Sequence, residues 1–182
     1  MSSAFQHRFI LTGGPGSGKS TIIDTIMKRG FWCSKESGRG VIQDQVNIGG
    51  DALPWANQTA FAELMLSWEM RSWHEAEGQT QPCFFDRGVP DIVGYLLLSA
   101  LTIPRHLENA IEKFRYNRTV FIAPPWKDIY VQDTERKQSF DIAVATYHAM
   151  VKTYRMYDYQ LIELPCVSVD ERVDFILSRI VR

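Results

Sequence analysis

A short segment near the start of the chain combines glycines, a lysine and a serine at a spacing typical of nucleotide phosphate sites. Residues 13–20 read GGPGSGKS and satisfy the pattern GxxxxGK[ST]. Glycines let the backbone approach phosphate oxygens, and the helix expected to follow presents its positive end to an anion. Lys19 is placed to neutralise the β- and γ-phosphates, and the Ser20 hydroxyl to bind Mg²⁺. The expected phosphate contacts are Gly13, Gly14, Gly16, Ser17, Gly18, Lys19, Ser20 and Thr21.

A second polar pair follows an apolar run of strand length. Asp86 ends the segment Cys83-Phe84-Phe85-Asp86, and ligands of open α/β sheets gather at the carboxyl ends of the strands. We therefore expect Asp86 to hold Mg²⁺, the alternatives being a helix N-cap or a solvated turn residue. Arg87 could clamp a donor or acceptor phosphate with its planar fork, or it is a surface arginine.

Strand-length apolar runs alternate with segments of helical period along the whole chain. Strands are expected at 9–12, 31–33, 83–86, 119–123 and 160–164. Helices are expected near 20–29, 38–47, 57–77, 90–101, 105–116 and 139–157, with a last one after 168. This alternation predicts an α/β fold with a parallel sheet, right-handed crossovers and helices on both faces. We expect one domain over residues 1–182.

Two of these helices carry specific signals. The helix expected at 57–77 places Phe61, Leu64, Met65 and Trp68 at i, i+3, i+4 and i+7, which predicts one buried apolar stripe. The last helix opens with the segment 168–171, which reads SVDE and predicts a capping box.

The composition disfavours several classes of protein. A formal net charge of −1 provides no overall field for a polyanion, so no nucleic-acid partner is expected. The three cysteines lie far apart, which disfavours a zinc site or a disulfide framework and fits a cytoplasmic protein. The longest apolar run, residues 92–103, is shorter than the roughly 20 residues of a membrane span. No membrane partner is expected.

The motifs resemble those of known P-loop families. Residues 13–19 resemble the loop of adenylate-kinase-type enzymes, and Asp86-Arg87 resembles the Asp/Glu-Arg pair of nucleoside and thymidylate kinases. Nearly the whole chain resembles a bacterial family of small "AAA-type ATPase domain" proteins. It is also similar to the ribosylnicotinamide kinase domain of the bifunctional NAD-biosynthesis regulator. The segments that carry the wider resemblance are 49–55, 84–88, 115–118 and 135–140.

The resemblance implies how two acids divide their roles. It implies strand order 2-3-1-4-5, which sets Asp86 about 5 Å and Glu36 about 10 Å from the strand that precedes the glycine loop. Asp86 is then expected at the metal. Glu36, which follows the second strand, is expected at the acceptor hydroxyl, unless it is a solvated loop acid. Arg39, one turn further on, is also expected to contact the acceptor.

A charged segment at 125–138 shows no clear period and lies where kinases of this type carry a lid. Arg136 and Lys137 would close over the transferring phosphoryl group, shed water and stabilise its spread negative charge. Lys137 is also expected to contact the substrate. A charged run of this kind is otherwise a solvated surface.

The sequence thus predicts a phosphotransferase that uses ATP and Mg²⁺ to phosphorylate a small acceptor. Its expected catalytic residues are Lys19, Asp86, Arg87, Glu36 and Arg136. The alternative is a regulatory or sensor ATPase that needs no acceptor. A regulatory GTPase is disfavoured because no Asn-Lys-x-Asp motif occurs and Asp91-x-x-Gly94 falls in an expected helix, although GTP is not excluded as the nucleotide.

Overall fold

The computed structural model describes residues 5–130 and 138–180, which form an open parallel sheet covered by helices on both faces. The sheet has the order β2-β3-β1-β4-β5, and all four neighbouring pairs are parallel. The strands are β1 (Arg8–Gly13), β2 (Trp32–Cys33), β3 (Cys83–Asp86), β4 (Thr119–Ala123) and β5 (Gln160–Glu163). The predicted α/β class and the strand order 2-3-1-4-5 are confirmed.

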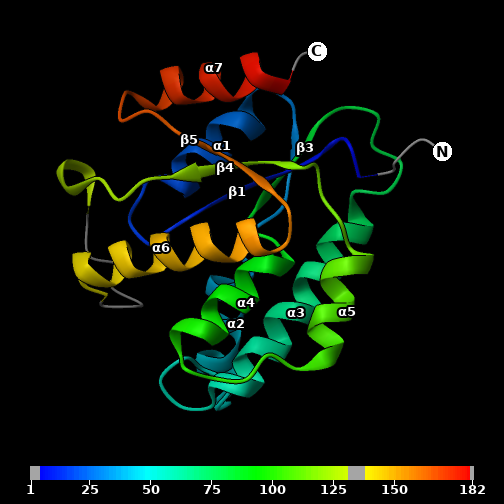
Figure 1. Ribbon diagram of the computed structural model, residues 1–182, viewed down its shortest axis with the longest axis vertical. Coiled ribbons are helices and arrows are strands. Elements are labelled where there is room, and N and C mark those ends of the chain that lie inside the picture. The colour runs from blue at the N-terminus through cyan, green and yellow to red at the C-terminus, as the bar shows by residue number, and fades with distance from the viewer. Residues whose placement is uncertain (1–4, 131–137, 181–182) are drawn as a thin grey trace.

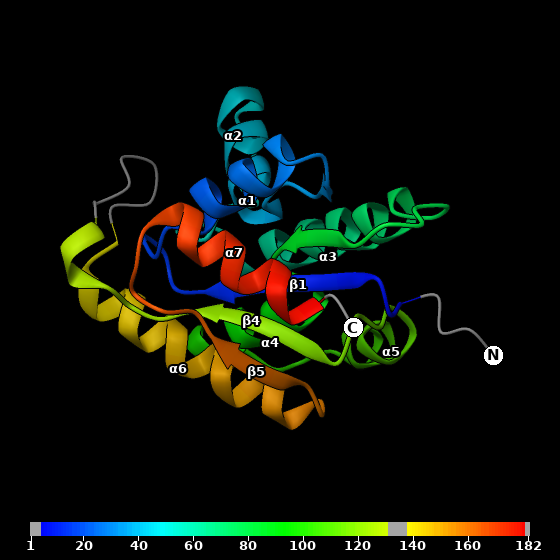
Figure 2. The same cartoon turned by 90° about the horizontal axis from the view of Figure 1, so that it is seen from above.

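The helices divide into two layers (Figure 1). One face of the sheet carries α1 and α7, and the other carries α6 and the group of α2 to α5. Seen from above, α7 lies in front of the sheet (Figure 2). The helices are α1 (Lys19–Lys28), α2 (Ser37–Ile48), α3 (Gln58–Glu75), α4 (Val89–Leu98), α5 (Arg105–Lys113), α6 (Phe140–Met156) and α7 (Val169–Ile180). Because β1, β2 and β3 are parallel, their carboxyl ends lie at the same edge of the sheet. The predicted site residues follow these strands at that edge.

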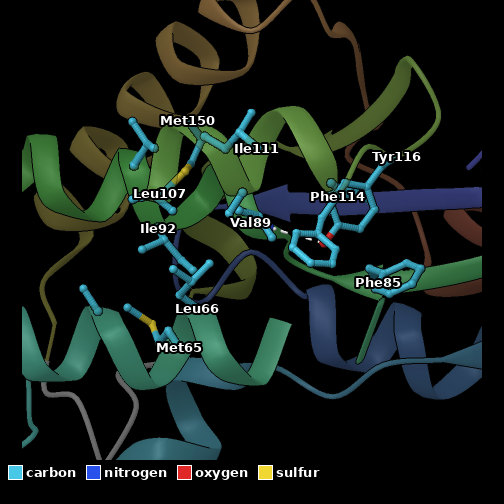
Figure 3. Packing of buried hydrophobic residues seen from close by; sticks show 14 of the residues in the cluster. Met65, Leu66, Phe85, Val89, Ile92, Leu107, Ile111, Phe114, Tyr116 and Met150 are labelled. Atoms are coloured by element: carbon cyan, nitrogen blue, oxygen red, sulfur yellow. Dashed lines mark hydrogen bonds between the residues drawn. The ribbon is translucent and has the colours of Figure 1, made fainter. Parts of the chain in front are cut away.

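The central strands of the sheet are buried on both faces: every residue of β1 and β3 is buried, as are the four residues of β4 that follow Thr119. Phe9 and Leu11 of β1 belong to the core beneath α1 and α7, whereas Ile10 belongs to the core on the other face. That second core continues between the helices, where Leu66 of α3 points toward Ile92 of α4 (Figure 3). Successive strand residues point to opposite faces, so one strand serves both cores.

The buried face of α3 differs from the predicted stripe. Phe61 and Met65 are buried, but Leu64 is 39% exposed, so its expected place in the core is wrong. The buried row instead continues to Glu69, which is 1% exposed. The spacing 61, 65 and 69 keeps all three side chains on one side of the helix. A carboxyl group therefore lies within an otherwise apolar face.

Two predictions about the C-terminal half of the chain had different outcomes. The capping box is confirmed, since the Ser168 N–H donates to Glu171 Oε2 at 3.1 Å and the Glu171 N–H donates to Ser168 Oγ at 3.4 Å. The segment 125–138 was expected to lack regular structure, but it contains a short 3₁₀ helix, η1 (Lys127–Ile129). Arg136 and Lys137 lie outside the described residues. None of the described helices is long and apolar enough to cross a membrane.

Candidate functional site

The glycine loop connects the end of β1 to the start of α1, as its motif requires. Gly18 immediately precedes α1 and has φ +84°, a left-handed conformation that residues with a Cβ rarely adopt. Gly14 is needed for a different reason: a Cβ there would lie 2.3 Å from the backbone oxygen of Ala143 in α6. Any side chain at position 14 would therefore clash with the backbone of α6.

The lysine of the loop is held inside it. Lys19 is 6% exposed, and its Nζ donates to the Gly14 carbonyl oxygen at 2.7 Å. Ser17 Oγ donates to the same oxygen at 2.8 Å, which gives the loop a second internal bond. The next two residues of α1, Ser20 and Thr21, are exposed. A buried ammonium beside exposed hydroxyls and a helix N-terminus is an arrangement that binds anions.

A buried arginine supports the loop from α7. Arg172 is 1% exposed, and its Nη1 donates to the Ser17 carbonyl oxygen at 3.1 Å. Its guanidinium also lies 5.8 Å from the ring of Trp126. Because a buried carbonyl needs a donor, Arg172 fixes the direction in which this peptide group points.

Asp86 lies beside the loop at the end of β3, where it pairs in register with Leu11 of β1. It is 4% exposed, and its Oδ1 has no hydrogen-bond partner among the described residues. Burial, with a further contribution from the charge of Glu36, raises the pKa of Asp86 to about 6, although Lys19 and Arg87 oppose the shift. An ion or a donor brought to Oδ1 would satisfy this buried carboxylate.

Those residues fit a Mg²⁺ ion that also binds nucleotide. Asp86 supplies a buried, unpartnered oxygen, and Ser20 supplies an exposed hydroxyl at the start of α1. Within residues 5–130 and 138–180 no group of three or more His, Cys, Asp or Glu side chains could hold a metal alone. Mg²⁺ typically takes one or two carboxylates and fills its other positions with phosphates and water, so the donor set is compatible with it.

Arg87 connects three elements at this edge of the sheet. Its Nε lies 3.3 Å from Glu36 Oε1, its Nη1 lies 3.2 Å from Asp91 Oδ1, and the same nitrogen donates to the Gly13 carbonyl oxygen at 2.9 Å. Burial by itself would lower the pKa of Arg87, but Glu36, Asp91 and Asp86 together raise it. The structure thus brings Glu36 to Arg87 at the mouth of the glycine loop.

Asp91 is a site residue that sequence reasoning missed. It accepts from the Thr12 hydroxyl at 2.5 Å, from the Gly88 N–H at 2.9 Å, and from the hydroxyl of Tyr154. With Arg87 these donors surround both oxygens of a carboxylate that is 5% exposed. One signal was available: an acid three residues after a helix N-cap can accept from the N–H of that cap, as Asp91 does from Gly88.

A cavity of about 480 Å³ opens beside these residues. Pro15 of the glycine loop, Glu36, Arg87 and Asp91 line one part of it, and α3, α4 and α6 supply mostly apolar walls. This volume falls in the range of small-molecule sites, roughly 300–1,000 Å³. Arg39 is half-buried on α2 and is not among the described residues that line the cavity, so its role stays a prediction.

Two further buried polar residues were not foreseen. Glu69 is one of the residues that line the cavity, and Arg172 contacts the glycine loop. Extending the i, i+4 row of Phe61 and Met65 by one turn reaches Glu69, so a signal existed there. Arg172 and Ser17 lie 155 residues apart, and no local pattern indicates their contact.

Comparison with known proteins agrees with this fold. A family model described as "AAA domain" matches residues 8–172. Among solved structures, deoxyadenosine kinase from M. mycoides with bound dATP has TM-score 0.54 and 14% identity, over 94% of this chain and 98% of that chain. NadR protein in complex with NR has TM-score 0.70 and 12% identity over 98% of this chain, which spans 52% of that one. At such identities the likeness concerns the fold. No curated protein sequence matches.

Proposed function

Since the chain belongs to the AAA domain family, and its fold is that of nucleoside kinases, we propose that it transfers the γ-phosphoryl group of ATP to a small hydroxyl-bearing acceptor. The observation that carries this proposal is the cavity that begins at the glycine loop and contains the Glu36–Arg87 pair. A sensor ATPase needs the loop but has no use for an acceptor cavity with a half-buried acid at its mouth.

The nucleotide side of the proposed site consists of the loop, Lys19, Ser20 and Asp86. Lys19 Nζ would leave the Gly14 oxygen and contact the β- and γ-phosphates as a point charge. Ser20 and Asp86 would hold Mg²⁺, which when bound neutralises charge on the phosphates. The backbone N–H groups from Gly16 to Thr21 would hold the phosphate oxygens.

The acceptor side consists of Glu36 and Arg87. The Glu36 carboxylate would accept the hydroxyl proton as the acceptor oxygen attacks the γ-phosphorus, and the bond to the β-phosphate oxygen would break. Arg87 holds Glu36 by an ion pair and places positive charge beside the Gly13 carbonyl, next to the phosphates. Arg136 and Lys137 remain proposed lid residues, and Arg39 a proposed acceptor contact.

Acceptor-dependent release of ADP tests the proposal. Phosphorus NMR of ATP and Mg²⁺ with nucleosides, ribosylnicotinamide and nucleoside monophosphates would identify a phosphorylated product directly. We expect ADP to form much faster with at least one hydroxyl acceptor than with water. Equal slow hydrolysis with every compound would instead support the sensor ATPase.

A further inference from the structure

Glu69 is a buried carboxyl group that the proposed reaction does not use. It lies on the row of α3 that also includes Phe61 and Met65, and all three residues line the cavity. Ser37 Oγ donates to its Oε1 at 2.7 Å. Its other oxygen, Oε2, is buried and has no hydrogen-bond partner among the described residues. A buried carboxyl with one unsatisfied oxygen is costly to keep unless a ligand completes it.

The described residues that line the cavity leave no further cation to pair with Glu69. Among the described residues that line the cavity, the acids are Glu36, Glu69 and Asp91, and the base is Arg87. Arg87 already contacts the other two acids at 3.3 and 3.2 Å. In the free protein, burial raises the pKa of Glu69 well above its ordinary value and so favours the protonated group. A ligand that brings N–H donors or positive charge would favour the ionised carboxylate instead.

The apolar part of the cavity narrows the chemistry of the ligand. Phe61 and Tyr95 form an edge-to-face pair with centroids 5.4 Å apart, and Ile92 and Met150 also line the cavity. Rings of this kind favour a flat or cationic group. A carboxyl group beside them suits a ligand that brings N–H donors or positive charge.

We propose that Glu69 is a specificity-determining residue of the acceptor cavity, and that its Oε2 binds a nitrogen-bearing group of the acceptor that carries N–H donors or a positive charge. This inference rests on the proposed acceptor site. It names a chemical class, amino-substituted or cationic ring compounds with a free hydroxyl, and it predicts poorer binding of analogues that carry a carbonyl or carboxylate at the same place.

Matched pairs of compounds test this preference. Titration calorimetry with Mg²⁺ and a non-hydrolysable ATP analogue would compare adenosine with inosine, cytidine with uridine, and ribosylnicotinamide with ribosylnicotinate. We expect the amino or cationic member of at least one pair to bind roughly tenfold or more tightly than its partner, as for a hydrogen bond to a charged group. Equal binding within every pair, preference for the carbonyl or carboxylate member, or failure of every amino or cationic member to bind would overturn the proposal.

The variant Glu69→Gln separates recognition from folding. The amide keeps the size of the side chain and can still accept from Ser37, but it presents NH₂ to the cavity. Discrimination within the preferred pair should shrink at least severalfold or invert, while ATP affinity and the circular dichroism spectrum stay unchanged. Glu75→Gln, at an exposed position of the same helix, is the matched control. Unchanged discrimination in a folded Glu69→Gln protein would contradict the role of Glu69.

A second variant covers the case in which the glutamine protein does not fold. Glu69→Asp keeps the carboxyl group and retracts it by one methylene, so the preferred member should bind more weakly while the order within each pair is preserved. A reversed order would count against the proposal. Binding preference without any acceptor-dependent ADP would refute the kinase but not this assignment, whereas phosphorylation without preference would refute this assignment alone.

Discussion

Replacing Lys19 with alanine tests the nucleotide site most directly. In the free protein the Lys19 ammonium is buried and donates to the Gly14 carbonyl oxygen at 2.7 Å. The proposed site exchanges this neutral partner for phosphate oxygens. Lys19→Ala removes that charge, so we expect the affinity for ATP to fall sharply while the fold persists.

The magnitude follows from the bonds that are exchanged. A hydrogen bond to a charged group contributes about 1.5–3 kcal/mol. Lys19 would gain one or two phosphate oxygens in exchange for the Gly14 carbonyl at 2.7 Å and a longer contact with the Ser17 hydroxyl at 3.4 Å. A net loss of about 2–4 kcal/mol corresponds to roughly thirtyfold to several-hundredfold weaker binding. The loop itself should hold, since Ser17 Oγ still donates to the Gly14 oxygen at 2.8 Å.

Calorimetric titration with a non-hydrolysable ATP analogue, at fixed Mg²⁺ and ionic strength, measures this loss. Lys28→Ala is the matched control because it removes the same side chain from an exposed position at the other end of α1. The control should bind the analogue like the wild type. Affinity of Lys19→Ala within twofold of that control, in a protein with an unchanged unfolding midpoint, would refute the assignment of the loop as a triphosphate site.

Three further predictions concern the neighbouring residues. Glu36→Gln should leave ATP affinity unchanged in titrations but slow acceptor phosphorylation about 100-fold or more in initial-rate assays. If Glu36→Gln instead abolished Mg·ATP binding, the roles assigned to Glu36 and Asp86 would be reversed. Gly14→Ala should lower the unfolding free energy by about 1–3 kcal/mol, because the new Cβ would meet the Ala143 backbone oxygen. An unchanged urea midpoint of this variant would contradict that expectation. The raised pKa of Glu69 means that the native state holds its proton more tightly than the unfolded chain, so wild-type stability falls as pH rises above about 4.5. Glu69→Gln should therefore gain stability relative to wild type between pH 5 and pH 8 in urea titrations, and a constant difference would argue against this.

Local sequence patterns determine more of the fold than of the site. Alternating apolar strands and amphipathic helices indicate a parallel α/β sheet, because such connections are right-handed and place helices on both faces. The strand order itself came from the resemblance to known families and not from the alternation. The glycine loop could be predicted because all its groups lie within 13–20, where local spacing determines their geometry.

The rest of the site depends on contacts that local patterns do not encode. Glu69 was missed because an apolar stripe is recognised from apolar residues, and a carboxyl group at the next position of the row is passed over. The Arg172 contact with Ser17 joins α7 to the loop, and nothing in either segment indicates the other. Asp91 forms a capping contact that local sequence suggests, but its bonds to Thr12 and Tyr154 arise only when β1, α4 and α6 pack together.

The backbone at Arg87 indicates why two adjacent residues can serve the two sides of the site. Asp86 is the last residue of β3, next to the strand that carries the loop, whereas Arg87 has φ +72° and so turns its side chain out of the strand's alternation. A left-handed residue with a Cβ costs roughly 1–2 kcal/mol, which glycine would avoid. Arg87 recovers this cost through bonds to Gly13, Glu36 and Asp91 that only a long planar cation can make together. In the proposed site, this left-handed turn would leave Asp86 at the phosphate side while Arg87 reaches Glu36 on the acceptor side.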